Sequence, residues 1–251
     1  MKRSIAAVLF LLAGCSAETE LTRLDATITA AELREGQVAV LGVVKFQEPD
    51  QIRPPLIATL ETVWREERPD VPLVTADSVR QALGTVRDQK LLLAYEYQGQ
   101  LDTQALDEIA DSLRGLARYV IVARVEKDRT RNSTRGINNS DTTAARTDWA
   151  MGITGRDATV AVQLYDLARK EVAVNARFEG SSENARPMLS PLQPRGTTEI
   201  TVEGQSPVPP DEPGYPGAPE LAMALQQPFR NFARILPGST KAPSSPPVEK
   251  R

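Results

Sequence analysis

The chain has 251 residues, 41% of them hydrophobic and 25% charged, with a formal net charge of −3. It is long enough for a sizeable core, and its balanced charge gives no reason to expect nucleic acid as a partner. The sequence has no histidine and one cysteine, which excludes serine–histidine catalysis, histidine-ligated zinc, internal disulfides and CxxC redox pairs. We therefore predict no metal site, no cofactor and no catalytic centre. An enzyme that uses aspartate, glutamate or lysine is the alternative.

The first fifteen residues have the layout of a secretory signal. Lys2 and Arg3 precede a short apolar run over 5–12, and a membrane-spanning helix would need about 20 residues. The run ends in a group that resembles the bacterial lipobox, whose cysteine is acylated: Leu12, Ala13, Gly14 and Cys15. The resemblance implies a signal peptide over 1–14, a lipid anchor on Cys15 and, because Ser16 follows, a place at the periplasmic face of the outer membrane. An ordinary signal peptide with an incidental cysteine is the alternative.

The next part of the chain alternates between strand and helix patterns. Residues 15–37 are polar and weakly patterned, and we predict a lipidated tether there. The β-branched run VAVLGVVKF, residues 38–46, is typical of a buried strand. Helical patterns follow over 54–68 and 77–84, with a short strand candidate at 71–74 between them. The segment KLLLAYEYQGQ, starting at Lys90, is compatible with strand or helix.

A clear amphipathic helix begins near Asp102 and is followed by three strand patterns. Residues 119–125 form a second buried run, and 158–165 and 172–179 flank a polar turn, which indicates a hairpin. The simplest arrangement is a long antiparallel meander over 119–131, 145–165 and 171–180. We therefore predict an α/β (α+β) domain over 38–180, with a mixed sheet, two or three flanking helices and this β-meander.

The composition changes after the meander. Fourteen of the nineteen prolines lie after position 186, so we predict a proline-rich connector over 181–218 and a disordered tail over 237–251. Between them, residues 219–236 predict an amphipathic helix kinked at Pro228. Its apolar stripe includes Phe229 and Phe232, and it either docks on the domain or contacts another protein.

Three patterns in this order resemble one family: VAVLGVVKF, GLARYVIVARVEKD and ATVAVQLYDLARKEVAVNARFEG. They are similar to the domain shared by the curli secretion lipoprotein CsgG, the penicillin-binding-protein activator LpoB and the N-terminal domain of TolB. The expected glycine of the hairpin turn is replaced within ARKE. The resemblance implies a non-catalytic binding or assembly module in a secretion or envelope-maintenance complex, with a periplasmic or outer-membrane protein partner or a homo-oligomer. A regulator of a peptidoglycan synthase is the alternative.

The segment 126–157 carries the candidate interaction residues of the meander: Arg129, Arg131, Arg135 and Trp149. Acidic residues are interspersed with these arginines, which favours a solvated β-arm over a dedicated anion site. A membrane hairpin would need an apolar outward face on both strands, and EKDRTRNSTR has none, so we favour the soluble arm. Glu61, Glu66 and Glu67 lie mostly away from the apolar side of their helix and predict a solvated surface rather than an acid/base pair.

Overall fold

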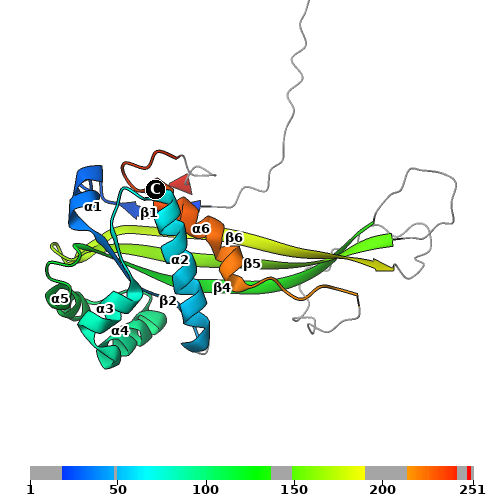
Figure 1. Cartoon of the computed structure of the whole chain (residues 1–251), viewed down its shortest axis with the longest axis horizontal. Helices are drawn as coiled ribbons and strands as arrows, with labels where there is room; N and C mark the ends of the chain where they lie inside the picture. The colour runs from blue at the N-terminus through cyan, green and yellow to red at the C-terminus, as the bar shows by residue number, and fades with distance from the viewer. Residues whose placement is uncertain (1–18, 48–49, 137–148, 190–213, 242–247, 250–251) are drawn as a thin grey trace, which may run out of the picture.

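The computed structural model describes residues 19–47, 50–136, 149–189, 214–241 and 248–249 (Figure 1). The strands are β1 (Thr19–Leu24), β2 (Val38–Lys45), β3 (Leu73–Val74), β4 (Tyr119–Gly136), β5 (Trp149–Asp166), β6 (Glu171–Leu189) and β7 (Val248–Glu249). The helices are α1 (Ala30–Gly36), α2 (Arg53–Glu67), α3 (Ala76–Leu83), α4 (Thr85–Gln98), α5 (Thr103–Ser112) and α6 (Leu221–Ile235), and a short 3-10 helix spans Asp50–Ile52.

One mixed sheet joins all of these strands in the order β3-β2-β4-β5-β6-β1-β7. β2 is parallel to β3 and β4, whereas β4, β5, β6 and β1 pair antiparallel in succession. The predicted fold class is confirmed: a mixed sheet, flanking helices and a long antiparallel meander, followed by a C-terminal helix. The described part of the chain has six α-helices, whereas we predicted two or three flanking helices and the C-terminal helix.

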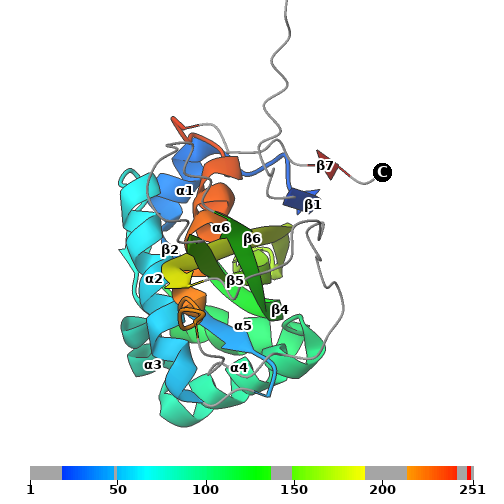
Figure 2. The same cartoon turned by 90° about the vertical axis from the view of Figure 1, so that its right-hand side faces the viewer.

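The two faces of the sheet are covered by different helices, as Figures 1 and 2 show. α2 and α6 share one hydrophobic cluster with β4, β5 and β6, and α3, α4 and α5 share a second cluster on the opposite face. β2 contributes alternate residues to both clusters: Val38, Val40 and Val43 to the first, and Ala39, Leu41 and Val44 to the second. Burial on both faces explains why the sequence of β2 is continuously apolar.

The first strand and helix correct the predicted tether over 15–37, which is wrong from Thr19 onward. β1 pairs antiparallel with β6, with Thr19 opposite Phe178. α1 begins with a capping box in which Thr29 and Glu32 bond each other's backbone N–H, and Leu33 is fully buried. A six-residue edge strand and a seven-residue helix are too short for their periodicity to stand out in the sequence.

The ambiguous segment after Lys90 is helical. α4 runs from Thr85 to Gln98, and its buried residues fall on one side of the helix: Asp88, Leu91, Leu92, Tyr95 and Glu96. It packs against β2 at Gly42, where an added Cβ would lie 2.8 Å from Leu92 Cδ2. The β2–β4 register also shifts at this glycine, so a bulge without a side chain lets α4 approach the sheet.

Two further boundaries differ from the prediction. Residues 181–189, assigned to the proline-rich connector, belong to β6 and pair with β5 up to Leu189 opposite Trp149. The tail prediction is wrong for residues 237–241, which lie against α2, where Arg68 Nη2 donates to Pro237 O at 3.0 Å. Residues 248–249 also pair with β1. Residues 190–213 lie outside the described part of the chain.

Candidate interaction surface

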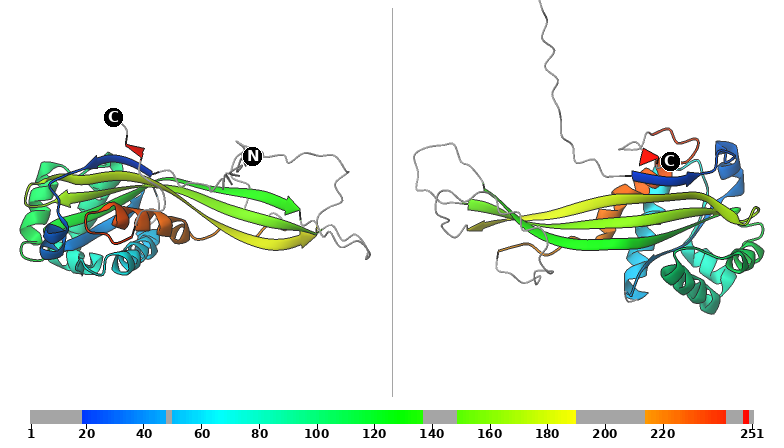
Figure 3. Two further views of the ribbon diagram at one scale, coloured as in Figure 1. Left: turned by 90° about the horizontal axis from the view of Figure 1, so that it is seen from above. Right: turned by 180° about the vertical axis from the view of Figure 1, so that it is seen from behind.

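The three long strands continue beyond the part of the sheet that the helices cover. β2 pairs with β4 as far as Lys45 opposite Val125, and β1 pairs with β6 as far as Thr19 opposite Phe178. The remaining residues, 127–136, 149–159 and 179–189, form what we call the arm; the rest of the sheet with its helices is the body. Figures 1 and 3 show the arm projecting away from the helices. At about 3.4 Å per residue, residues 179–189 extend β6 by roughly 35 Å.

An ion-pair cluster lies where the arm leaves the body. Asp128 Oδ2 lies 2.8 Å from Lys45 Nζ and 2.6 Å from Arg156 Nη2, and Arg156 Nε donates to Asp128 Oδ1 at 2.7 Å. The Asp128 side chain is only 7% exposed. Burial opposes ionisation, but the hydrogen bonds from Arg156 and Lys45 outweigh it and hold the pKa of Asp128 below its ordinary value. The cluster thereby links β2, β4 and β5 at the base of the arm.

One face of the arm carries a charged ladder across its three strands. Arg131 Nε donates to Asp157 Oδ2 at 2.9 Å, and Arg131 Nη2 donates to Glu183 Oε1 at 3.0 Å. The guanidinium crosses the central strand at Gly155, where an added Cβ would lie 3.1 Å from Arg131 Nε. Arg129 and Arg135 occupy the same face because side chains alternate along a strand, and both are exposed. The charged residues share this face with Met151 and the buried Ile153, and no described helix covers it.

The other face of the arm is covered in part by an extended segment, residues 214–219, which we call the strap. Three side chains donate to its carbonyl oxygens: Thr154 Oγ1 to Pro216 at 2.6 Å, Asn184 Nδ2 to Gly217 at 2.9 Å and Arg156 Nη1 to Pro219 at 3.0 Å. The hydroxyl of Tyr215 also lies 2.7 Å from Thr134 Oγ1. Prolines leave backbone carbonyls without internal partners in an extended segment, and the arm supplies those partners.

α6 follows the strap and lies on the same face of the sheet. Pro228 has no N–H, so the carbonyl of Ala224 loses its usual helical partner. That carbonyl lies over β6 at Gly180, where an added Cβ would be 2.2 Å from Ala224 O and 2.6 Å from Pro228 Cδ. A residue with a side chain at position 180 would therefore hold α6 off the sheet. The predicted helix is confirmed, and Pro228 lies inside it.

Charged side chains hold the C-terminal end of α6 against α2. Arg234 Nε donates to Glu67 Oε2 at 2.9 Å, and Lys241 Nζ lies 3.2 Å from the same oxygen. The hydrogen bond from Arg234 lowers the pKa of Glu67 despite the opposing effect of burial. Arg68, with a fully buried side chain, donates to Ala233 O and Pro237 O. These cations complement the negative end of the α6 dipole.

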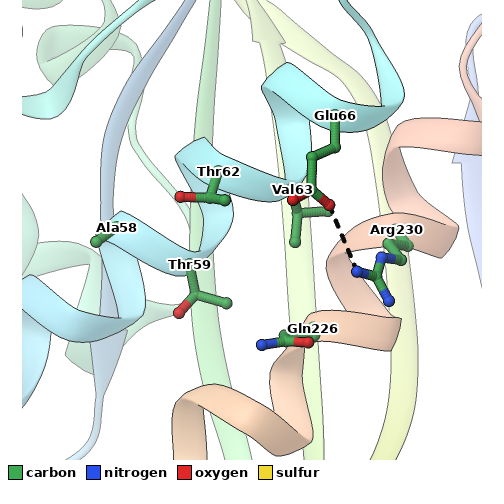
Figure 4. A pocket seen from close by; sticks show the side chains of 7 residues that line it. All are labelled: Ala58, Thr59, Thr62, Val63, Glu66, Gln226 and Arg230. Atoms are coloured by element: carbon green, nitrogen blue, oxygen red, sulfur yellow. Dashed lines mark hydrogen bonds and ion pairs between the residues drawn. The ribbon is translucent and has the colours of Figure 1, made fainter.

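Two shallow hollows lie on the described part of the structure. One, of about 290 Å³, lies between α2 and α6 (Figure 4) and is lined by Ala58, Thr59, Thr62, Val63, Glu66, Gln226 and Arg230. Glu66 Oε2 is ion-paired across it with Arg230 Nη2 at 3.4 Å. The other, of about 220 Å³, is lined by residues 35–37 and 115–118. Neither lining contains two carboxylates facing each other. Among the described residues, no group of three or more acidic or cysteine side chains is placed to hold a metal ion.

The predicted interaction residues differ in their exposure to solvent. Arg129, Arg131 and Arg135 are exposed on one face of the arm, and Arg131 is neutralised by Asp157 and Glu183. Phe229 and Phe232 are completely buried, with the Phe232 ring 6.2 Å from that of Phe178 and 6.4 Å from that of Trp64. α6 therefore docks on its own domain, and these two phenylalanines are unavailable to another protein.

Other predicted site residues lie at or beyond the limits of the described part. Trp149 is the first residue of β5, at the far end of the arm. Cys15, Leu12, Ala13 and Gly14 lie outside the described residues. None of the described helices has the length and apolar character that crossing a membrane requires. Glu67, predicted to be solvated, is buried against Arg234, and Glu61 Oε1 accepts the N–H of Ala76 at the start of α3.

Local sequence patterns do not reveal the strap or the side chains that donate to it, Thr154, Asn184 and Arg156. Each of them is a common surface residue, and only the strand register brings Thr154 opposite Asn184. The available signal was the position of the threonines and asparagines at every second residue of β4, Thr130, Asn132 and Thr134, which marks one polar face. The base cluster at Asp128 joins residues 45, 128 and 156 and has no local signal.

Comparisons with known proteins give structural likeness only. No family model matches the chain, and no curated protein matches it in sequence. Among solved structures, a PelC dodecamer from Paraburkholderia phytofirmans is similar at 14% identity, with a TM-score of 0.32, over 66% of this chain and 83% of that one.

Two further solved structures are similar to a comparable degree. The LpoB C-terminal domain from Salmonella enterica is 15% identical over 64% of this chain and 87% of that one, with a TM-score of 0.31. The lipoprotein GNA1162 from Neisseria meningitidis is 11% identical over 62% and 87%, with a TM-score of 0.34. Likeness at this level assigns no activity and no partner to the chain.

Proposed function

We propose that the protein is a lipid-anchored, non-catalytic module of the bacterial envelope that uses its arm to bind another component of a secretion or envelope-maintenance complex. The observation that supports this proposal is the arm. It is a three-stranded extension with a charged face that no described helix covers, and few of its residues belong to the hydrophobic clusters. Ordering a sheet of this length costs conformational entropy, and a binding role would explain why the arm is kept. The exposed arginines supply groups that are suited to contact with a protein surface.

The anchor that we propose at Cys15 places the body close to its membrane. Four residues lead from Cys15 to Thr19, where β1 begins, and a fully extended chain of that length spans about 14 Å. A distant partner in another membrane would therefore have to come to the arm or be reached through it. This disfavours the alternative of a peptidoglycan synthase regulator that works across the periplasm on a long N-terminal tether.

The anchor is tested by changing Cys15 to Ala in the producing cell. We expect the altered protein to leave the membrane fraction and to lose incorporation of labelled fatty acid, because the acylated thiol supplies the membrane affinity. A Ser16→Ala variant, which keeps the cysteine, is the matched control. If the Cys15→Ala protein still fractionates with membranes, the anchor is wrong.

The role of the arm is tested by photo-crosslinking in intact cells. A photoreactive residue at Ser133 or Arg135, both exposed in the arm, should give one reproducible adduct with a defined envelope protein. The same residue at Arg114, whose side chain is 81% exposed in the body, is the control. A further charge reversal at Arg129 should weaken the adduct. Equal adducts from arm and body positions would contradict a role for the arm in binding.

A further inference from the structure

Exposed apolar side chains gather along one helix of the body, α4. Of the seven large apolar side chains that are exposed in the described part of the chain, four lie on α4 or against it: Phe46, Val86, Leu93 and Tyr97. Their exposed fractions run from 49% for Phe46 to 80% for Val86. Single exposed apolar residues are ordinary on a protein surface, but a cluster of this kind marks a contact surface.

Helical periodicity places three of these residues in one line. Val86, Leu93 and Tyr97 follow one another at spacings of seven and four residues, which keeps them on one side of an α-helix. Lys90 falls between Val86 and Leu93 on the same side. We call these four residues, together with Phe46, the α4 stripe. Figures 1 and 2 show α4 at the margin of the body, with no described element beyond it.

The structure holds Phe46 in place at the C-terminal end of α4. Its ring meets that of Tyr97 edge to face, with 5.3 Å between the ring centroids. The next residue, Gln47, has a φ of +57° and donates its backbone N–H to Glu96 Oε1 at 2.9 Å. Arg53 Nη2 donates to the second carboxylate oxygen of Glu96 at 2.8 Å. Buried polar groups therefore fix the turn that presents Phe46 beside the helix.

The exposed charges of α4 are all positive. Its two carboxylates, Asp88 and Glu96, are buried, and each is ion-paired with an arginine of another helix. Its exposed charged residues are Arg87 and Lys90, and neither makes an ion pair with another described residue. By contrast, α5 on the same face of the sheet exposes Asp111 and no large apolar side chain. An apolar line flanked by unpaired cations thus distinguishes α4.

We infer that the α4 stripe binds the surface of a membrane that contains anionic phospholipid. Leu93, Tyr97 and Phe46 enter the boundary between headgroups and acyl chains, and Arg87 and Lys90 contact lipid phosphates. Leucine and aromatic residues flanked by cations are the side chains that interfacial helices use. Neither of the two hollows described above is lined by α4, so the stripe projects from the surface, as contact with a flat lipid layer requires.

The contact rests on the proposed membrane location and adds a second point of attachment to the anchor at Cys15. Phe46 and the start of β1 lie at the same level of the sheet. A single row of paired residues crosses the sheet from β2 to β1 through Lys45, Val125, Val160, Phe178 and Thr19. Its ends are four strand spacings apart, about 19 Å.

The depth of the helix layer also agrees with the length of the anchoring segment. A helix with its side chains is about 10–12 Å across, so the outer side of α4 lies roughly that far from the sheet. The four residues from Cys15 to Thr19 span about 14 Å when extended. An acylated Cys15 and the α4 stripe can therefore reach one membrane surface together.

Vesicle binding of the unacylated chain tests the contact. The chain from Ser16 to Arg251 keeps every described element and has no cysteine, so a Leu93→Cys variant can carry one environment-sensitive fluorophore. We expect its emission to shift to the blue with vesicles of phosphatidylglycerol and phosphatidylcholine, and not with phosphatidylcholine alone. The matched control is a label in a Met223→Cys variant on α6, which should not respond, because the two side chains are 51% and 53% exposed.

Single substitutions separate the apolar and the electrostatic contributions in vesicle cosedimentation. Leu93→Ser should weaken binding about tenfold, because apolar burial drives interfacial association, and Met223→Ser should leave it unchanged. Arg87→Gln should weaken binding to phosphatidylglycerol vesicles about fivefold. Arg114→Gln, which removes an exposed cation elsewhere on the body, is its matched control. All four side chains are exposed, and circular dichroism checks that each variant folds.

Three results would overturn the inference. The first is unchanged emission of the label at position 93 with phosphatidylglycerol vesicles. The second is an equal shift with phosphatidylcholine alone, which would remove the role of the cations. The third is a shift that appears without vesicles when the protein is concentrated, which would assign the stripe to a second copy of the chain.

The test is separate from that of the anchor. Acylation of Cys15 plays no part in vesicle binding by the unacylated chain, and incorporation of fatty acid at Cys15 does not involve the α4 stripe. Binding through the stripe depends on cations and is weakened by salt, so a high-salt wash removes it from the fractionation of the Cys15→Ala protein. Either idea can therefore fail while the other stands.

Discussion

The body and the arm share three continuous strands but are held together by different forces. In the body, β4, β5 and β6 contribute buried side chains to the hydrophobic cluster beneath α2 and α6, and β4 and β5 also contribute to the second cluster. In the arm, the same strands are joined by the Arg131 ladder, the Asp128 cluster and four hydrogen bonds to the strap. The same strands are therefore held by apolar packing in the body and by ion pairs and hydrogen bonds in the arm.

This difference predicts that the arm and the body respond differently to perturbation. Burial of apolar surface contributes about 25 cal/mol per Å², whereas exposed ion pairs contribute less than about 1 kcal/mol each. Changes in the body should therefore alter global unfolding, and changes in the arm should alter local opening. The four predictions below test that division, beginning with the largest expected effect.

The largest effect is expected in the body at Phe232. Changing Phe232 to Ala should lower the free energy of unfolding by about 3–5 kcal/mol, because its buried ring contacts Trp64 and Phe178. Met223→Ala on the same helix, where the side chain is 53% exposed, is the control and should change little. Urea unfolding followed by circular dichroism measures both. Similar losses for the two variants would contradict the docking of α6.

The junction between body and arm is tested at Gly180. Gly180→Ala should lower the free energy of unfolding by about 1–3 kcal/mol, because Ala224 O lies 2.2 Å from the position of the new Cβ. Gly217→Ala, where nothing lies within 4 Å, should be tolerated. Limited proteolysis after Arg230 or Arg234 would show whether α6 is released. An equally resistant Gly180→Ala protein would mean that the close contact is not required.

The base of the arm should be sensitive to pH through Asp128. Its lowered pKa means that the carboxylate adds stability above the unfolded pKa of about 3.9, and that this contribution is lost as pH falls through the lower folded value. Asp128→Asn should therefore lower the free energy of local opening at the base of the arm by about 1–3 kcal/mol at pH 7. The difference from the unchanged protein should shrink below about pH 4. A difference that stays constant down to pH 3 would show that Asp128 does not titrate in this way.

The smallest effect is expected at Arg131. Its pairs with Asp157 and Glu183 involve side chains that are 46–51% exposed. Arg131→Ala should therefore lower the free energy of local opening of the arm by less than about 1 kcal/mol, and by less still at high salt. Hydrogen exchange should become faster in 151–157 and remain unchanged in 160–166. Arg114→Ala, which breaks an exposed pair with Asp111 in the body, is the control. A shift in the global unfolding midpoint would contradict the separation of arm and body.

Local patterns predicted some elements well and left others out. The buried strands 38–45 and 119–125 and the helix carrying Phe229 were predictable because apolar residues repeat at the spacing of the element. β1 and α1 were missed because only their pairing with β6 and the burial of Leu33 reveal them. The sequence also left open whether Phe229 and Phe232 face a partner, and their burial in the body decides it.

By itself, the sequence determined the α/β class and the meander, because each depends on neighbouring residues along the chain. The signal with Cys15 stays a prediction. Only the tertiary structure decided that residues 19–24 join the sheet, that the strap crosses the arm, and that Lys45, Asp128 and Arg156 form one cluster. These contacts join residues from 28 to 159 positions apart. Their formation depends on strand register and on the path of the chain, which no local pattern records.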